Sequence, residues 1–278
     1  MSTKHVIIIG DSRRMPEVKN RSIHLVVTSP PYWNLKRYPD NPAQLGNIGS
    51  YEMFLDELDK VWKECYRALV PGGRLCVVIG DVCHARRKHG RHRLTPLHAD
   101  VIRRCVDIGF DYLAPIIWYK IANVRTEMDR PSYFLGKPYL PNAVIKNDIE
   151  YILIFRKPGD YRHPTQEQIE KSRIPKEEFF EYFKQIWTLP GESTRNHPAP
   201  FPLEIPLRLI KMFSYVGDTV LDPFLGIGTT TLAAMRLGRN SIGYEVEPSY
   251  VPMIKRRLAS YYARLDGTTV EIRFRDRA

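Results

Sequence analysis

The sequence predicts an α/β protein whose mostly parallel sheet is flanked by helices. Short runs of β-branched residues alternate along the chain with amphipathic stretches at helical spacing, a pattern typical of successive strand–helix units. A proline-containing turn near the N-terminus and a glycine-containing turn near the C-terminus each follow an apolar strand directly. The length of 278 residues fits one domain that spans 1–278.

Each expected strand is a short apolar run bounded by polar or turn-forming residues. The expected strands cover residues 5–9, 23–28, 74–79, 112–118, 150–155, 219–222 and 241–245. Residues 270–275 alternate apolar and charged side chains, which predicts a further strand with one face in water.

The clearest helix follows Gly49, where Ser50 can cap the first turn and apolar residues recur at helical spacing as far as Leu69. Pro71-Gly72-Gly73 is expected to end this helix and to lead into the next strand. Further helices are expected over about 96–108, 203–215, 229–237 and 248–265. Segment 156–196 is rich in charge and proline and departs from the alternation, so we expect an inserted module there rather than a sheet element.

The composition indicates a basic intracellular protein. Lysine and arginine number 42 against 31 aspartates and glutamates, which gives a net charge of +11. An excess of this size favours a polyanionic partner, although many basic proteins bind no nucleic acid. No apolar run approaches the roughly 20 residues of a membrane-spanning helix, and the first apolar run is too short for a secretory signal. We therefore expect a cytoplasmic protein whose four cysteines are reduced.

The segment from Thr219 to Thr230 combines a strand, a turn that contains Gly226 and Gly228, and the start of a helix. Glycine lets the backbone approach a ligand closely and adopt dihedral angles that other residues avoid. Glu245 ends the next strand roughly 20 residues further on, where an acidic side chain binds the ribose hydroxyls of nucleotide-like ligands. The two features predict a nucleotide-like cofactor site, with a tight turn and a solvated carboxylate as the structural alternatives.

The second candidate site, Ser29-Pro30-Pro31-Tyr32, directly follows an apolar strand. Proline restricts its own φ angle and the conformation of the residue before it, so this turn is stiff and presents hydroxyl and carbonyl oxygens as acceptors. Two acceptors beside an aromatic ring suit a flat group that carries an exocyclic amino group. A brace for the loop, without a binding role, is the alternative interpretation.

The two turns together resemble motifs of DNA methyltransferases that modify exocyclic amino groups. Ser29-Pro30-Pro31-Tyr32 resembles their catalytic tetrapeptide, residues 222–230 resemble their S-adenosylmethionine loop, and residues 243–245 are similar to their ribose-binding strand end. Because the catalytic motif precedes the cofactor loop, the chain is identified as a member of the β class, whose motif order is circularly permuted. The resemblance implies a Rossmann-like methyltransferase fold with a small inserted recognition region, for which residues 156–196 are the candidate.

The resemblance also implies the reaction and the residues that perform it. A methyl group would pass from S-adenosylmethionine to a base rotated out of the duplex, and no metal is implied. Ser29 and the Pro30 carbonyl would accept the amino hydrogens, Tyr32 would stack on the base, and Pro31 completes the catalytic turn. The implied cofactor-binding residues are Asp11, Ser12, Phe201, Asp222, Phe224, Gly226, Gly228, Thr229 and Glu245.

The target base follows from the first residue of the tetrapeptide. Serine at this position goes mostly with cytosine N4 in the family, so the resemblance implies an N4-cytosine-specific enzyme. The family also implies that the enzyme belongs to a restriction–modification system. Adenine N6 is the alternative target for the same site. A basic DNA-binding protein whose methylation site has decayed is the alternative from another class, and the intact motifs speak against it.

Double-stranded DNA is the implied partner, with a cognate restriction endonuclease as a second candidate and a monomer or homodimer as the active form. The densest basic run, 86–93, is expected to contact phosphates, which supplies affinity without sequence information. A solvated basic loop is the alternative. The candidate DNA-binding residues are Lys36, Arg37, Arg86, Arg87, Lys88, Arg91, Arg93, Arg125 and Arg130.

Overall fold

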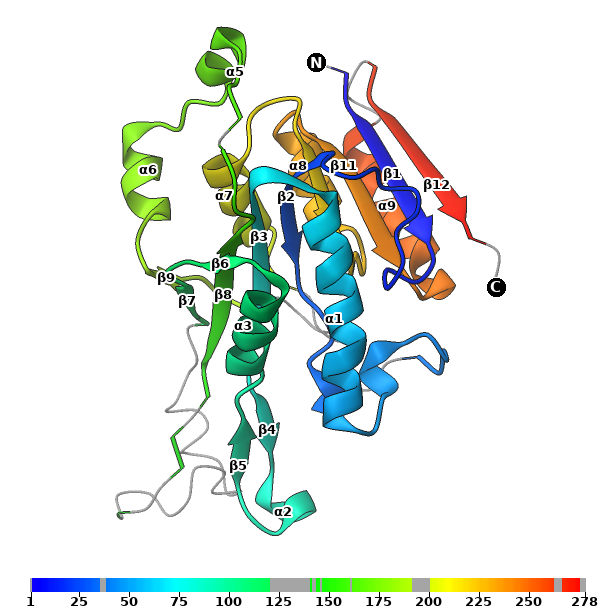
Figure 1. Cartoon of the computed structure of the whole chain (residues 1–278), viewed down its shortest axis with the longest axis vertical. Helices are drawn as coiled ribbons and strands as arrows, with labels where there is room; N and C mark the ends of the chain where they lie inside the picture. Colours follow the sequence, from blue (N-terminus) through cyan, green and yellow to red (C-terminus); the bar gives the residue numbers. More distant parts are fainter. Residues whose placement is uncertain are drawn as a thin grey trace.

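A computed structural model describes residues 2–35, 39–120, 141, 144–145, 147–160, 162–191, 201–262 and 267–275. They form one large sheet with helices on both faces, and a small two-stranded sheet, β4–β5, projects beyond one edge (Figure 1). The strands are β1 (Lys4–Ile9), β2 (Ile23–Thr28), β3 (Leu69–Ile79), β4 (Val82–His84), β5 (Arg93–Thr95), β6 (Asp111–Tyr112), β7 (Ile116–Tyr119), β8 (Ile149–Arg156), β9 (Ile186–Thr188), β10 (Thr219–Asp222), β11 (Asn240–Glu245) and β12 (Thr269–Phe274).

The helices connect these strands. They are α1 (Tyr51–Ala68), α2 (Arg86–His89), α3 (Leu97–Ile108), α5 (Gln166–Lys171), α6 (Lys176–Tyr182), α7 (Glu204–Phe213), α8 (Thr229–Arg236) and α9 (Val251–Tyr262). Short 3₁₀ helices cover Trp33–Leu35, Leu45–Asn47 and Pro248–Tyr250. Among the described residues, no helix has both the length and the apolar character needed to cross a membrane.

The large sheet has the strand order β12-β1-β11-β10-β2-β3-β8-β7-β9, and β6 pairs with β8 outside this path. From β12 to β3 all neighbouring strands are parallel, whereas β8 runs antiparallel to β3 and β7. β2 and β10 are direct neighbours, with Val220 opposite Leu25, although they lie near opposite ends of the sequence. The predicted mostly parallel α/β architecture is confirmed.

Helices pack on both faces because successive side chains of a strand point to opposite sides. Val26 of β2 belongs to the core beneath α1 and α3, whereas Leu25 and Val27 belong to the core beneath α7 and α8. A third apolar cluster joins β1 to α9. The four cysteines are free, as expected, and three of them are buried.

The strand and helix bounds depart from expectation where long-range pairing decides them. Pro71-Gly72-Gly73 lies inside β3 rather than in a turn, because Gly72 N–H donates to the Lys157 carbonyl (2.9 Å) and Lys157 N–H donates to the Gly73 carbonyl (3.0 Å). The strand expected over 112–118 is divided into β6 and β7. The helix expected over 248–265 begins as a 3₁₀ turn, and its end beyond Tyr262 lies outside the described residues.

The prediction that residues 156–196 contribute no sheet element was wrong at Arg156, the last residue of β8, and at β9. This strand pairs with β7 because Trp187 is fully buried and its indole N–H donates to the Tyr182 carbonyl (3.0 Å). α5 lies at the amino-terminal edge of the sheet, where the Gln168 side chain donates to the Val216 carbonyl (3.0 Å) just before β10. Residues 162–182 therefore lie at the edge opposite the one where β10 ends, and Figure 1 shows α5 and α6 there.

Candidate active site

The predicted site motifs follow the carboxyl ends of parallel strands, the edge at which open α/β sheets bind their ligands. β1 leads into Gly10-Asp11-Ser12, β2 into the turn at residues 29–32, and β10 into the glycine loop. Glu245 is the last residue of β11. These four strands are neighbours in the sheet and end on the same side of the molecule (Figure 1).

One pocket at this edge is lined by both turns, so the N-terminal and C-terminal motifs meet in one cleft. The predicted residues that line it are Asp11, Ser12, Ser29, Pro30, Pro31, Phe224, Gly226 and Glu245. The lining residues absent from the predicted set are Gly10, Ala43, Gln44, Leu45, Pro223, Tyr244, Val246 and Tyr250. Pro223 and Tyr244 lie within the motifs at 222–230 and 243–245, and Gly10 directly precedes the predicted Asp11, so these positions were the available signal.

Of the predicted catalytic and cofactor-binding residues, five do not line this pocket: Tyr32, Phe201, Asp222, Gly228 and Thr229. Phe201 packs in the core beneath α7 and α8. Gly228 caps α8 with a left-handed φ of +84°, and Thr229 is buried in the first turn of that helix. The structure thus places these three in the support of the pocket rather than on its surface.

Glu245 is the buried carboxylate of the pocket, with 7% of the residue exposed. Its Oε2 accepts from the Gly226 amide (2.7 Å) and its Oε1 accepts from the Glu247 amide (2.9 Å). Burial outweighs these hydrogen bonds and raises the pKa of Glu245 to about 8. The carboxyl is held in one orientation, and a ligand that donates hydrogen bonds to it would favour its ionised form.

Asp222 joins the catalytic turn to the cofactor loop. The Thr28 hydroxyl, just before Ser29, donates to Asp222 Oδ1 (2.7 Å), and the Phe224 amide donates to the same oxygen (3.1 Å). Burial raises the pKa of Asp222 to about 6 despite these bonds. Only 2% of Asp222 is exposed, and the residue does not line the pocket. Its hydrogen bonds to Thr28 and to the Phe224 amide instead hold the two turns together.

The glycine loop depends on conformations that favour glycine. Gly226 has a φ of +55°, and its amide is the one that orients Glu245. A Cβ at Gly243 in β11 would lie 2.6 Å from a methyl group of Leu225, so glycine at that position lets the loop pack against the strand. The Leu225 amide in turn donates to the Tyr244 carbonyl (2.8 Å).

The catalytic turn is held on both sides. The Ser29 hydroxyl lies 3.4 Å from the Tyr32 hydroxyl, which donates to Glu150 Oε2 at the start of β8 (2.9 Å). Trp33 has a φ of +46°, a strained value for a bulky residue, and its indole N–H donates to the Ile48 carbonyl (2.8 Å). Glu150 was expected only as the start of a strand, because the sheet order alone brings β8 beside this turn.

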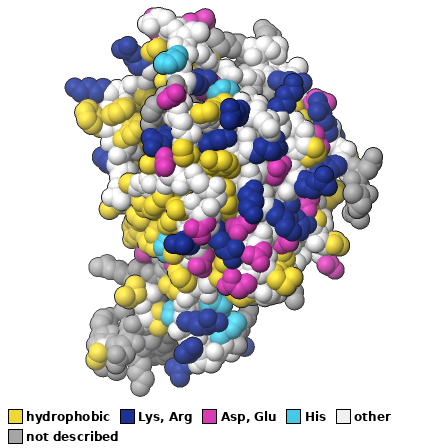
Figure 2. Space-filling view, in the orientation of Figure 1, with side chains coloured by type: hydrophobic (Ala, Val, Ile, Leu, Met, Phe, Trp, Pro, Cys, Tyr) yellow, Lys and Arg dark blue, Asp and Glu magenta, His cyan; other side chains and the backbone are white. Residues whose placement is uncertain are grey.

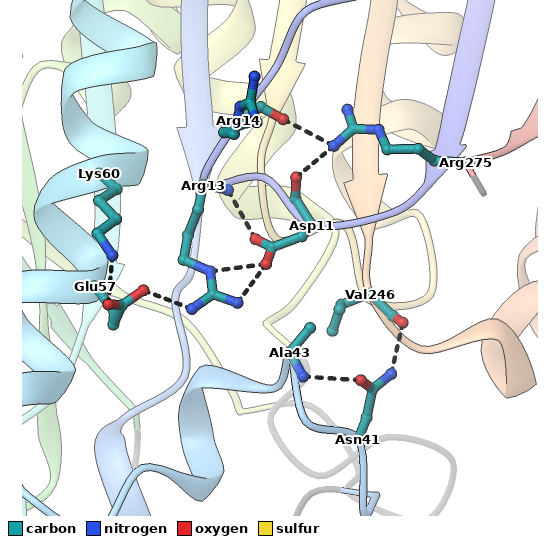
Figure 3. A network of polar contacts seen from close by, with 9 residues as sticks. All are labelled: Asp11, Arg13, Arg14, Asn41, Ala43, Glu57, Lys60, Val246 and Arg275. Atoms are coloured by element: carbon teal, nitrogen blue, oxygen red, sulfur yellow. Dashed lines mark hydrogen bonds and ion pairs between the residues drawn. The ribbon is translucent and has the colours of Figure 1, made fainter. Parts of the chain in front are cut away.

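Figure 3 shows the polar network beside the pocket. The Asp11 carboxylate accepts from the backbone (2.8 Å) and the guanidinium of Arg13, which also pairs with Glu57 of α1. Arg275 donates to the Asp11 carbonyl (2.9 Å) from the residue after β12. The turn after β1 is therefore held from both the helical layer and the C-terminal strand.

Residues 43–45 form another wall of the pocket. Asn41 Nδ2 donates to the Val246 carbonyl (2.9 Å) and its Oδ1 accepts from the Ala43 amide (3.0 Å), which ties the segment that carries them to the end of β11 (Figure 3). Gln44 and Leu45 are both buried against the pocket. No motif or periodicity marks these residues in the sequence.

The predicted DNA-binding arginines that are described lie on one hairpin. Arg86, Arg87, Arg91 and Arg93 are exposed on α2, β5 and the loop between them. Within the described part of the chain, none of the four forms an ion pair with a carboxylate. Figure 2 shows Lys, Arg and His side chains gathered over this hairpin at the lower end of the molecule. Lys36, Arg37, Arg125, Arg130 and the side chain of Lys88 lie outside the described residues.

A larger hollow, about 560 Å³, lies at the opposite edge of the sheet, between the start of β3, α6 and the end of α7. None of the predicted site residues borders it. Two of its cations already have partners, since Arg162 pairs with Asp218 and Lys211 pairs with Glu178. The smaller pocket, which joins both turns, is therefore the candidate active site.

Comparisons with known proteins agree over nearly the whole chain. Residues 23–256 match the family described as DNA methylase. The chain is 41% identical to the Type II methyltransferase M.MjaI of Methanocaldococcus jannaschii, covering 100% of this chain and 98% of that one. It is 40% identical to the Type II methyltransferase M.MthZI of Methanothermobacter thermautotrophicus, covering 93% and 77%.

Solved structures show the same fold. The putative DNA modification methylase TTHA0409 of Thermus thermophilus, complexed with S-adenosyl-L-methionine, shares 49% identity with a TM-score of 0.79, covering 100% of both chains. PvuII DNA methyltransferase (cytosine-N4-specific) shares 23% identity with a TM-score of 0.66, covering 98% of this chain and 96% of that one. The fold class expected from the sequence is confirmed.

Proposed function

This chain belongs to the family of S-adenosylmethionine-dependent Type II DNA methyltransferases, and from that membership we propose that it methylates the N4 amino group of cytosine at a specific site in double-stranded DNA. The observation that carries the proposal is the single pocket lined by the Ser29-Pro30-Pro31 turn and by Gly226 and Glu245. A site for an amino group thereby adjoins a site for a nucleoside. Serine as the first residue of the turn favours cytosine N4 over adenine N6, as it does in most of the family.

The catalytic turn suits an exocyclic amine, which is a poor nucleophile because its lone pair is delocalised into the base. The Ser29 hydroxyl and the Pro30 carbonyl would each accept one amino hydrogen. These hydrogen bonds strengthen as the nitrogen becomes tetrahedral and positive, so they lower the barrier rather than merely hold the substrate. Proline at positions 30 and 31 keeps the two acceptors in place, because its φ angle is fixed.

Tyr32 would stack on the flipped base and stabilise the developing positive charge with its π face. The residue is 8% exposed, so a base can stack on the ring only when neighbouring chain moves aside. Rotation of a base out of the duplex and opening of this site would therefore occur together. The turn ends directly after Tyr32, at Trp33, whose backbone has a strained positive φ.

The residues around the pocket fit the cofactor. Each oxygen of Glu245 accepts one backbone amide and keeps a lone pair for a ribose hydroxyl. Phe224 is partly exposed at the pocket and offers aromatic surface for an adenine ring. When bound, S-adenosylmethionine supplies a methyl group on a positively charged sulfur. The chain's own contribution is to hold the nucleoside at Glu245 and the target amine at Ser29.

We propose that the hairpin β4–α2–β5 contacts the phosphate backbone. β4 begins three residues after β3 ends, so the hairpin extends from the same edge of the sheet as the pocket (Figure 1). The recognition role expected for residues 156–196 stays a prediction, and α5 and α6 of this segment lie at the edge opposite the pocket. Action in the cytoplasm, as a monomer or homodimer and beside a cognate restriction endonuclease, is part of the same proposal.

The decisive test is mass spectrometry of nucleosides from unmethylated DNA incubated with the purified protein and deuteromethyl-labelled S-adenosylmethionine. Labelled N4-methylcytosine is expected. Labelled N6-methyladenine would overturn the choice of base, and failure to bind the cofactor in equilibrium dialysis would support the decayed DNA-binding protein instead.

Ser29→Ala tests the role of the hydroxyl. We expect kcat to fall by about 100-fold, the scale seen when one transition-state hydrogen bond is removed, with cofactor affinity unchanged. Ser22→Ala, just before the other end of β2, is the matched control and should leave kcat unchanged. An unaltered rate in Ser29→Ala would show that the hydroxyl has no catalytic role.

A further inference from the structure

Glu150 is a charged residue in direct contact with the catalytic turn, and no site role was expected for it. It is the second residue of β8, and its Oε2 accepts a hydrogen bond from the Tyr32 hydroxyl (2.9 Å). Its Oε1 accepts from the ammonium group of Lys120, which follows β7. The Glu150 side chain is 13% exposed, so its charge lies in a largely desolvated position where such bonds are strong.

Gly80 makes this contact possible. It follows β3, which lies between β2 and β8 in the sheet. A Cβ at Gly80 would lie 3.1 Å from Cγ of Glu150 and 3.3 Å from Cε2 of Tyr32. Glycine therefore leaves the space in which the carboxylate and the ring meet, and this is independent of the hydrogen bond itself.

Lys120 holds the carboxylate from its other side. Its ammonium group lies 5.2 Å from the centre of the Trp118 ring, and Trp118 is buried. The lysine is thus placed by contacts that do not involve Glu150, and the carboxylate is fixed between a cation and the phenol. Of the two oxygens, one is directed to Lys120 and the other to Tyr32.

We infer that Glu150 is a positioning residue for methyl transfer, an inference that rests on the role proposed for Tyr32. By accepting the hydroxyl hydrogen it fixes the plane of the Tyr32 ring against which the target base stacks. A phenol that donates to a carboxylate is also more electron-rich, so its π face stabilises more strongly the positive charge that develops on the amine. Glu150 acts through Tyr32 and does not touch the substrate.

A double-mutant cycle tests the inference with Glu150→Gln, Tyr32→Phe and the combination. Each single variant should lower kcat by about tenfold, with KM for S-adenosylmethionine changed less than about twofold. Because both changes remove the same charged hydrogen bond, the double variant should lose no more than either single one. Glu271→Gln, in an exposed ion pair with Arg273 on β12, is the matched control and should match the wild type.

Glu150→Asp provides a second variant that keeps the charge. Its carboxylate is one methylene shorter and falls short of the Tyr32 hydroxyl, so the same loss of kcat is expected without loss of the negative charge. Cofactor binding by calorimetry and thermal unfolding, measured for every variant, separate this loss from misfolding.

Two results would overturn the inference. One is a double variant whose loss is the product of the two single losses, since Glu150 would then act independently of Tyr32. The other is a Glu150→Gln enzyme with wild-type kcat. Failure of the proposed function is distinguishable from both, because the wild-type protein itself would then produce no N4-methylcytosine.

Discussion

Glu245 offers a test in which stability and cofactor affinity change in opposite directions. Its carboxyl ionises near its ordinary value of 4.5 in an unfolded chain, whereas burial raises its pKa in the fold to about 8. Between these pH values the folded state keeps a proton that the unfolded state has lost, so stability falls as the pH rises from 4.5 to 8. The difference of 3.5 pH units (8 − 4.5), at ~1.4 kcal/mol each, is worth at most ~5 kcal/mol above pH 8.

Glu245→Gln removes this ionisation and places an amide in the same position. Glutamine can still accept from the Gly226 amide, but its amino group then faces the Glu247 amide, and the lost hydrogen bond costs about 1–3 kcal/mol. Near pH 5 the variant should be less stable than the wild type by that amount. Near pH 9 it should be more stable by about 2–4 kcal/mol, so the two stability curves cross.

Cofactor affinity should respond in the other direction. Ribose hydroxyls donate to the ionised carboxylate of Glu245, so wild-type affinity for S-adenosylmethionine should rise about tenfold per pH unit below pH 8 and level off above it. Glu245→Gln should bind about 10- to 100-fold more weakly near pH 8 and lack this pH dependence.

Urea unfolding near pH 5, 7 and 9 measures the stability, and titration calorimetry at the same pH values measures the affinity. Glu271→Gln, on the exposed edge strand β12, controls for the loss of a carboxylate elsewhere. Parallel stability curves for wild type and Glu245→Gln, or a wild-type affinity that does not change with pH, would refute this account.

Three further substitutions test separate parts of the structure. Thr28→Val removes one hydrogen bond from the buried Asp222 carboxyl and should lower the free energy of unfolding, measured by urea denaturation, by about 1–3 kcal/mol. An unchanged free energy of unfolding would show that this bond does not hold the two turns together. Gly228→Ala places a side chain at a φ of +84° and should lower the free energy of unfolding by about 1 kcal/mol, which a lower Tm would show. The matched control Gly49→Ala should leave the Tm unchanged, because nothing lies within 4 Å of the new methyl group. Arg86→Ser combined with Arg87→Ser should weaken binding to all DNA duplexes alike. The slope of log K against log salt concentration, measured by fluorescence anisotropy, should fall by about 0.9 for each phosphate contact that is lost. A loss of affinity confined to one DNA sequence would contradict a phosphate role.

The strands and turns that carry the site were predictable because their signals are local. β2 and β10 have the expected bounds, since each is a short apolar run that ends at a turn. Ser50 caps α1 as expected, with its hydroxyl accepting from the Met53 amide (3.4 Å). Gly226 and Gly228 adopt the positive φ angles for which glycine is suited.

The departures from expectation occur where a distant partner decides the conformation. Pro71-Gly72-Gly73 has the composition of a turn, yet Lys157 pairs with it and extends β3. β9 has only three residues, too few for a pattern, and it forms because it pairs with β7 and because Trp187 packs in the core beneath α7 and α8. Neither partner can be identified from residues nearby in the chain.

For this protein, the sequence alone determined the elements, the two turns and Glu245, because backbone preference, apolar period and motif spacing act over a few residues. Which of these groups are in contact depends on the three-dimensional arrangement of the strands. The order of the strands places Thr28 against Asp222 and brings Glu150 to Tyr32, and the Asn41–Val246 hydrogen bond ties the segment that carries residues 43–45 of the pocket wall to the end of β11. Such contacts join residues far apart in the chain, and they depend on which strands are neighbours rather than on any local pattern.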